Sequence, residues 1–434
     1  MCVLFLGGRE MRIVSKVGAL VVLLSLCVLC GVSSGFSGAG SGTQADPYVI
    51  TTVQQLQGMN DDLDAHYILG NDIDASETQT WNGGAGFEPV GSSTDPFTGK
   101  FDGRMFTITG LYIDRPTTDL VGLFGHITDG AVVQSVGLAE VDITARRNSG
   151  PLVGSSSGAT VCYCWSSGNI RGWHDYQMRL GGLMGISSSA DSYVYQCFSS
   201  VNVTATGGAH QVGGLAGYNG HGSIMSDCYA TGDVSGHLKV GGLVGDNPYP
   251  EGGYITRCYS TGKVSGTGGG LVGFNYKGGV TYDSYWDTET SGKSSSYGGA
   301  GKTTAQMMQQ TTFVGWDFVD IWHIVEDQTY PFLRPYSARM RAISGLKDAI
   351  REKEELLADI EAVIEREQAA YDALDRLLAG GDYGDLSRGD IINARQKIHS
   401  AIQHEQQSKD ALHKSIEKLY DALAALGWAP LATD

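Results

Sequence analysis

The stretch Val240-Gly241-Gly242-Leu243-Val244-Gly245, followed by Cys258-Tyr259-Ser260-Thr261-Gly262-Lys263-Val264, decides the fold, because versions of it recur along the chain. The glycine block returns at intervals of 28 to 32 residues. A repeat of this length indicates stacked supersecondary units, none of which can bury its apolar side alone. The blocks begin and end at Gly122 and Gly125, Gly150 and Gly154, Gly182 and Gly185, Gly214 and Gly217, Gly242 and Gly245, and Gly270 and Gly273.

Two further columns of residues follow the glycine blocks. They lie in segments rich in Val, Ile, Thr, Tyr, Gly and Ser, a composition that favours strands and turns. Residues that recur once per unit predict parallel strands in register, about 4.8 Å apart. The sequence therefore predicts a mainly β fold, namely a right-handed parallel β-helix or solenoid. The first column is Ser135, Cys164, Cys197, Cys228, Cys258 and Ser284, and the second is Val136, Trp165, Phe198, Tyr229, Tyr259 and Tyr285.

The bulk composition narrows the class of protein. The 434 residues leave room for two or three domains. The 62 glycines follow the repeat period, so a disordered low-complexity chain is a poor interpretation. The net charge of −17 argues against nucleic acid as a partner, because a phosphate-binding surface needs a basic stripe.

The first 35 residues have the pattern of a secretory signal peptide. Arg12 and Lys16 precede an apolar run over residues 17–32, and small residues follow. Met11 is a better start than Met1, because it places the basic residues directly before that run. No other segment is apolar enough for a membrane anchor, so the signal peptide predicts an extracellular or cell-surface location. The predicted divisions are residues 1–35 signal peptide, 36–45 flexible linker, 46–120 cap and first coils, 121–290 repeats, 291–336 C-terminal cap and 337–434 helical hairpin.

The composition changes abruptly at Ser337, after which Ala, Leu, Glu, Lys and Gln dominate. Apolar residues then recur in steps of three and four on either side of a breaker at residues 380–385, which predicts an antiparallel, coiled-coil-like helical hairpin. Lys353 and Glu367 fall on core-type positions of the first helix. The hairpin is predicted to dock on the solenoid end or to self-associate with another hairpin, and the alternative is a solvated spacer, because its helix surfaces are densely charged with both signs. Its predicted inward positions are Ile343, Leu346, Ile350, Leu357, Ile360, Ile364, Tyr371, Leu374 and Leu378, then Ile391, Ala394, Ile398, Ile402, Leu412, Ile416, Leu419, Leu423 and Leu426.

The repeats resemble the GLUG family, which occurs in secreted and surface proteins of bacteria and archaea, including large adhesins and IgA-specific peptidases. The resemblance rests on Val212-Gly213-Gly214-Leu215-Ala216-Gly217 with Cys228-Tyr229-Ala230-Thr231-Gly232-Asp233-Val234-Ser235-Gly236, and on the next unit, residues 240–245 with 258–266. It covers roughly residues 46–335 and implies a β-solenoid and secretion. Pro151 replaces a motif glycine, and the first unit lacks the cysteine.

The cysteine column Cys164, Cys197, Cys228 and Cys258 has three interpretations. Buried free thiols are favoured, since small buried side chains suit a column of this kind. Disulfides between neighbouring coils are the second, although parallel side chains fit the disulfide dihedral poorly. A metal site is the third, and no CxxC spacing supports it. We expect the thiols to face inward.

The aromatic column Trp165, Phe198, Tyr229, Tyr259 and Tyr285 is predicted to face outward and to form a structural stack between coils, with a carbohydrate-stacking face as the alternative. The preceding column, Asp227, Arg257 and Asp283, alternates in charge and is predicted to be a ladder exposed to solvent.

No catalytic arrangement is visible in the sequence. His404-Glu405 begins a zinc-peptidase pattern, but Ser408 stands where its second histidine belongs. Asp72 and Asp74 form the best acidic cluster and also suit a polar turn. We therefore expect a non-enzymatic adhesion, binding or scaffold protein without a cofactor, whose partner is an extracellular glycan or surface protein. There are two alternatives. One is a polysaccharide-active β-helix enzyme, namely a lyase or glycosidase, and the other is a self-assembling surface-layer element.

Overall fold

The computed structural model describes residues 36–128, 130–173, 178–208, 210–248, 252–276, 279–334, 337–381 and 386–425. The chain divides into two units, Met1–Thr304 and Ala305–Asp434. The predicted signal peptide and Leu426 lie outside the described residues. Within these residues, no helix is both long and apolar enough to cross a membrane.

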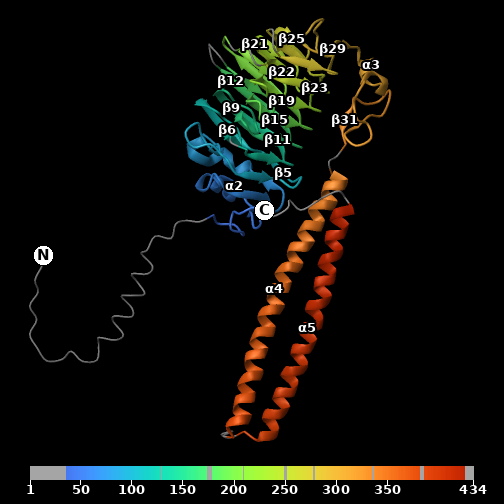
Figure 1. Cartoon of the computed structure of the whole chain (residues 1–434). Helices are drawn as coiled ribbons and strands as arrows, with labels where there is room; N and C mark the ends of the chain where they lie inside the picture. Colours follow the sequence, from blue (N-terminus) through green and yellow to red (C-terminus); the bar gives the residue numbers. More distant parts are fainter. Residues whose placement is uncertain are drawn as a thin grey trace, which may run out of the picture. The chain divides into compact units, whose positions relative to one another are not determined.

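The first unit is a parallel β-solenoid, so the predicted fold class is confirmed (Figure 1). Successive coils add strands to three sheets, and every strand pairing within this unit's named strands is parallel. The nine-stranded sheet contains β1 (Tyr48–Ile50), β2 (His66–Leu69), β4 (Lys100–Asp102), β8 (Val132–Gln134), β11 (Thr160–Cys162), β15 (Tyr193–Tyr195), β19 (Ile224–Ser226), β23 (Tyr254–Thr256) and β27 (Val280–Tyr282).

The other two sheets complete each coil. The six-stranded sheet contains β7 (Phe124–Thr128), β10 (Val153–Ser157), β14 (Met184–Ser188), β18 (Ala216–Gly220), β22 (Val244–Asp246) and β26 (Val272–Phe274). The fourteen-stranded sheet contains β3 (Ile73–Asp74), β5 (Thr107–Thr109), β6 (Tyr112–Asp119), β9 (Gly137–Arg147), β12 (Trp165–Trp173), β13 (Leu180–Gly181), β16 (Phe198–Thr206), β17 (His210–Gly213), β20 (Tyr229–Ala230), β21 (Val234–Gly241), β24 (Tyr259–Ser260), β25 (Val264–Gly269), β28 (Tyr285–Asp287) and β29 (Ala300–Lys302).

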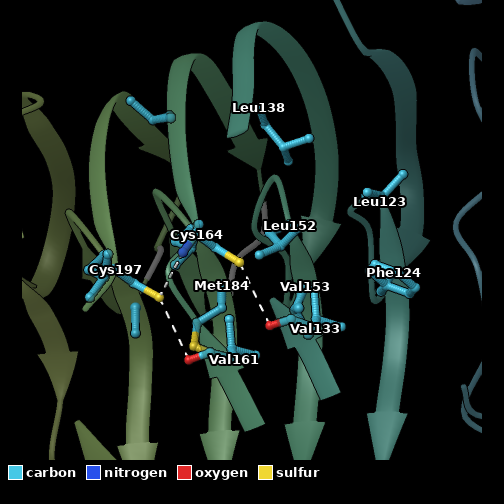
Figure 2. Packing of buried hydrophobic residues seen from close by; sticks show 14 of the residues in the cluster. Leu123, Phe124, Val133, Leu138, Leu152, Val153, Val161, Cys164, Met184 and Cys197 are labelled. Carbon is cyan, nitrogen blue, oxygen red and sulfur yellow. Dashed lines mark hydrogen bonds between the residues drawn. The ribbon is translucent and has the colours of Figure 1, made fainter. Parts of the chain in front are cut away.

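The core runs along the inside of the solenoid. Leu152, Val153, Val161 and Met184 are buried there beside Cys164, as Figure 2 shows. Such side chains come from all three sheets, so each coil contributes a layer that only the next coil can cover. The core is therefore shared between coils.

Short elements close the N-terminal end of the solenoid. Helix α2 (Val53–Gln57) begins with a capping box in which Thr52 accepts from the Gln55 amide and Gln55 reaches back. The 3₁₀ segments η1 (Gly58–Asp61) and η2 (Ser76–Gly84) follow. Residues 36–45, predicted to be a flexible linker, instead pack on the first coil, since the Phe36 ring lies 4.6 Å from the Tyr48 ring and Ala39 bridges Val49.

One repeat is aligned differently from the prediction. Gln134 pairs with Cys162, which places Val136, and not Ser135, level with Cys164. Ser135 has φ +55° and is level with Tyr163, Gln196, Asp227, Arg257 and Asp283, whose φ values are also positive. These residues form a left-handed corner between the nine-stranded and fourteen-stranded sheets. This corner fixes how the first repeat aligns with the later ones. Matching small residues along the sequence does not detect the corner, because it is a feature of the backbone conformation.

The second unit contains α3 (Thr304–Met307, which begins at the boundary), η3 (Gln310–Thr312), the antiparallel strands β30 (Trp322–His323) and β31 (Phe332–Leu333), and two long helices. Helices α4 (Ser337–Gly380) and α5 (Arg388–Ala425) pack against each other, which confirms the predicted hairpin. One inward position was wrong: Arg395, and not Ala394, faces α4, where it pairs with Asp375 and lies over the Tyr371 ring.

Candidate ligand-binding face of the solenoid

The repeat glycines have a structural role. None of the glycines that begin or end a repeat block has a positive φ. Instead, a Cβ on Gly242 would lie 2.1 Å from the carbonyl oxygen of Gly270, and one on Gly214 would lie 2.1 Å from that of Gly242. The glycine column is therefore where neighbouring coils touch backbone to backbone.

The cysteine column is buried, and its thiols are free. Figure 2 shows two of its members, Cys164 and Cys197. Each Sγ donates to the carbonyl two residues earlier, at 3.1 Å for Cys164 and Cys228 and 3.3 Å for Cys197. Burial raises the pKa of these three thiols well above its ordinary value. Cys258 makes the same bond at 3.2 Å. Thiols held neutral and away from solvent fill the core and are poor nucleophiles.

The aromatic column forms a continuous stack. The Trp165 and Phe198 rings are 5.9 Å apart, Phe198 and Tyr229 are 4.8 Å apart, and Tyr229 and Tyr259 are 5.0 Å apart, all within 7° of parallel. The inner rings have both faces covered by other rings, so a sugar cannot stack there. Tyr285, at the end of the column, has Lys302 Nζ 5.8 Å from its ring. This geometry favours the structural interpretation over the carbohydrate face.

The charged corner column is exposed at Asp283, as predicted for the ladder, but Asp227 is buried. The Asp227 side chain is only 4% exposed, and its carboxylate accepts two bonds from Arg257 at 2.6 and 2.7 Å. This hydrogen bonding raises the pKa of Arg257. The pair joins two neighbouring coils and is a buried structural contact.

The nine-stranded sheet carries exposed tyrosines that the sequence analysis missed. Tyr193, Tyr254 and Tyr282, on β15, β23 and β27, are 40%, 46% and 59% exposed. The register aligns Tyr193 with Ile224, Tyr254 and Val280, and Tyr195 with Ser226, Thr256 and Tyr282. We call these eight residues the tyrosine face. Every side chain in it is neutral.

Alternation along each strand places the tyrosine face outside. Between the two outward positions, Val194, Met225 and Ile255 are buried in the core. The sequence signal was therefore present, at two and four residues before Cys197, Cys228, Cys258 and Ser284. The tyrosines alternate with Ile, Val, Ser and Thr from coil to coil, so no single residue type marks these positions as a column.

A cavity of about 620 Å³ lies near the C-terminal end of the solenoid. The Lys239 ammonium at its wall is 2.7 Å from Asp246 and 4.4 Å from the centre of the Phe274 ring. Asp246 also accepts from Gln211 at 2.6 Å. The cation is therefore neutralised within the wall. The lining residues are Leu238, Lys239, Thr267, Gly268, Gly273, Phe274, Ser295, Ser296 and Tyr297.

The best acidic cluster in the sequence forms a turn. Asp72 accepts from the Thr107 amide, and Asp74 accepts from the Ser76 amide at 2.9 Å. That bond lowers the pKa of Asp74, which is opposite to what a general acid needs. Asp287 similarly accepts from the amides of Glu289 and Thr290. Among the described residues, no group of three or more His, Cys, Asp or Glu side chains could hold a metal ion.

Comparison with known proteins supports the repeat family and the fold. Residues 208–235 match the family model described as the GLUG motif, which confirms the resemblance. The chain is 34% identical over 307 residues to halomucin of Haloquadratum walsbyi, covering 68% of this chain and 3% of halomucin. It is 35% identical over 128 residues to a candidate Gly-rich membrane protein of Evansella cellulosilytica, covering 29% of this chain and 14% of that protein. The chain thus spans a small part of these relatives.

A solved structure shares the architecture. The crystal structure of a candidate immunoglobulin A1 protease from Bacteroides ovatus aligns with a TM-score of 0.53 and 21% identity. The alignment covers 69% of this chain and 95% of that one. At this identity, the similarity shows a common fold alone.

Proposed function

We propose that this chain is a secreted or cell-surface β-solenoid that binds a neutral glycan through its tyrosine face. The observation that carries the proposal is the exposure of Tyr193, Tyr254 and Tyr282 on one sheet. Large exposed aromatic side chains grouped on a rigid surface are typical of a binding site. A tyrosine offers an apolar ring and a polar hydroxyl, which suits a sugar that has both kinds of surface.

The shape and charge of the face favour an extended, neutral ligand. Tyr193 and Tyr254 are two strands apart in register, about 9.6 Å along the solenoid. A chain of pyranose rings running across the strands can contact both. The aligned Ile224, Ser226, Thr256 and Val280 supply apolar and hydroxyl groups without charge. A charged partner would find no counter-charge among these residues, although the whole chain carries −17.

Similarity to halomucin and to a protein named as a membrane protein favours a surface or extracellular location. A non-enzymatic role is supported by the state of the carboxylates described above, which are held in turns or ion pairs. The competing proposal is an enzyme, since a structural relative is named as a candidate immunoglobulin A1 protease. That name belongs to the relative, and the shared fold carries no activity with it.

A glycan array with the full-length protein tests the proposal. The wild type should bind neutral polysaccharides, and Tyr193→Ala/Tyr254→Ala should weaken binding by roughly 10- to 100-fold, since it removes the two exposed rings that are aligned in register. Trp173→Ala is the matched control, because Trp173 is 60% exposed on β12, in another sheet. Equal losses for both variants, or no glycan binding by the wild type, would exclude the tyrosine face as the site.

The enzyme alternative is tested on the same protein. Incubation with the bound polysaccharide should release no new reducing ends, and incubation with immunoglobulin A1 should leave it intact. New reducing ends, or cleaved immunoglobulin A1, in the wild-type reaction would favour the enzyme and overturn the binding proposal.

A further inference from the structure

The helical hairpin has two unlike flanks. The flank that carries Glu361 and Asp375 is tied by polar contacts: Lys409 pairs with Glu361 at 2.7 Å, and Arg395 pairs with Asp375 at 2.5 Å. On the same side, the Tyr420 hydroxyl donates to Glu354 at 3.2 Å. These contacts also set the alignment of the helices, because each joins residues at the same height along the antiparallel pair.

The opposite flank is apolar and partly exposed to solvent. Leu356, Val363 and Leu377 lie seven or fourteen residues apart on α4, with Ala370 completing the stripe, and they are 50%, 38% and 44% exposed. Residues spaced by sevens line one edge of a helix in a coiled-coil pair. At the same heights on α5, the residues are small: Ser415, Ser408, Ala401 and Ala394. We call these eight residues the apolar flank.

The hairpin buries little by itself. Among its described side chains, Ile350, Ile391 and Ile416 are the buried apolar ones, and Leu346, Leu357, Leu412 and Leu419 pack partly against Ile350 and Ile416. Glu367 occupies an inward position, and its Oε2 has no hydrogen-bond partner among the described residues. Two helices of 44 and 38 residues with so small a core gain much from further burial.

We propose that the apolar flank binds the same flank of a second copy of this chain, forming a four-helix bundle. The flank is self-complementary. With a two-fold axis along the bundle, α4 of each copy lies against α5 of the other, so Leu356 and Val363 enter the spaces above Ser415 and Ser408 of the partner copy. Glu352 and Lys418 border the flank at the same height, on α4 and α5 respectively, and face each other across this interface.

Sedimentation of the full-length protein over a wide concentration range tests the proposal. The wild type should have the mass of a dimer. Leu356→Glu/Val363→Glu places charges on the apolar flank and should raise the dimer dissociation constant by at least about 100-fold. Circular dichroism should show that the helix content is unchanged.

The matched control adds the same charge elsewhere. Ile392 and Leu386 are exposed apolar residues outside the apolar flank, so Ile392→Glu/Leu386→Glu should leave the dimer intact. A monomeric wild type, or equal dissociation of both variants, overturns the proposal. A flank variant that melts earlier at unchanged mass also overturns it, because the flank would then be covered by another part of the same chain.

A mixing experiment tests the arrangement. Val363→Cys protein mixed with Ser408→Cys protein should form a disulfide-linked heterodimer under mild oxidation, because these residues meet across the proposed interface. The five described native thiols are buried and do not compete. Linked homodimers of each variant in place of the heterodimer would exclude the α4-to-α5 arrangement.

Discussion

At the scale of single residues, the solenoid depends on positions where one coil touches the next without room for a side chain. Gly242 is one of them, since both the Gly270 carbonyl and the Ser260 hydroxyl lie within 2.7 Å of an added Cβ. Its backbone φ is not positive, so the requirement concerns space and not backbone conformation.

Gly242→Val should therefore destabilise the protein by about 3 kcal/mol or more, because two coils must separate to admit the side chain. Thermal and denaturant unfolding measure this. Gly58→Val is the control, since an added Cβ there meets only Phe36 at 3.8 Å and φ is −65°. A Gly242→Val melting curve that coincides with the wild type would refute the close-contact explanation.

Two arginine–aspartate pairs between neighbouring coils differ mainly in burial. Arg257→Met should cost about 3 kcal/mol, because it removes the cation beside the nearly buried Asp227. Arg171→Met should cost less than about 1 kcal/mol, since Arg171 and Asp142 are both about half exposed. Chemical denaturation of both variants makes the comparison. Equal losses would show that burial does not decide the strength of these pairs.

At the scale of elements, the cysteine column couples neighbouring coils and makes the solenoid sensitive to alkaline pH. In the unfolded chain a thiol ionises near pH 8.5, whereas burial raises the pKa of Cys164, Cys197 and Cys228 in the folded state. Their contribution to stability is therefore complete below about pH 8.5 and falls as the pH rises towards the folded pKa, because only the unfolded state then releases the protons.

Each of these thiols should lower the unfolding free energy by up to about 1.4 kcal/mol per pH unit above that point. Urea unfolding between about pH 7 and about pH 9.5 measures how steeply the unfolding free energy falls with pH. The variant with Cys164, Cys197 and Cys228 all changed to Ala should lose most of this pH dependence. Thiol titration of the unfolded, unreduced protein is the control and should find these cysteines free. A wild-type slope no steeper than that of the variant would contradict the burial effect.

At the scale of the whole molecule, the solenoid offers the proposed binding face and the hairpin offers the proposed means of pairing. If both proposals hold, a dimer presents two tyrosine faces, and binding to a glycan-coated surface gains avidity. The effect needs no direct contact between the two units.

Removing residues 337–434 should then yield a monomer that binds a soluble oligosaccharide as well as the full chain does. Its retention on an immobilised polysaccharide should fall by about 100-fold or more, because the second attachment is lost. Surface plasmon resonance with both ligand formats compares the two proteins. Weaker binding of the soluble oligosaccharide would show that the hairpin acts on the binding face itself and not through valency.

The amino-acid sequence by itself determined the architecture of both units. A glycine block that returns with a nearly constant period specifies stacked coils, since each unit must present the same surfaces to its neighbours. Apolar steps of three and four likewise specify the hairpin of α4 and α5. In both cases a short period in the sequence corresponds directly to a repeated contact in space, so fold and family could be predicted.

The tertiary structure decided which side chains those contacts leave available. The left-handed corner moved Val136 into the cysteine column, and burial of Asp227 turned an expected surface charge into an internal pair. Tyr193, Tyr254 and Tyr282 became a face only because strands far apart in sequence lie in register. Exposure depends on every neighbour that packs around a residue, and those neighbours come from other coils, so the repeat period alone could not reveal the candidate site.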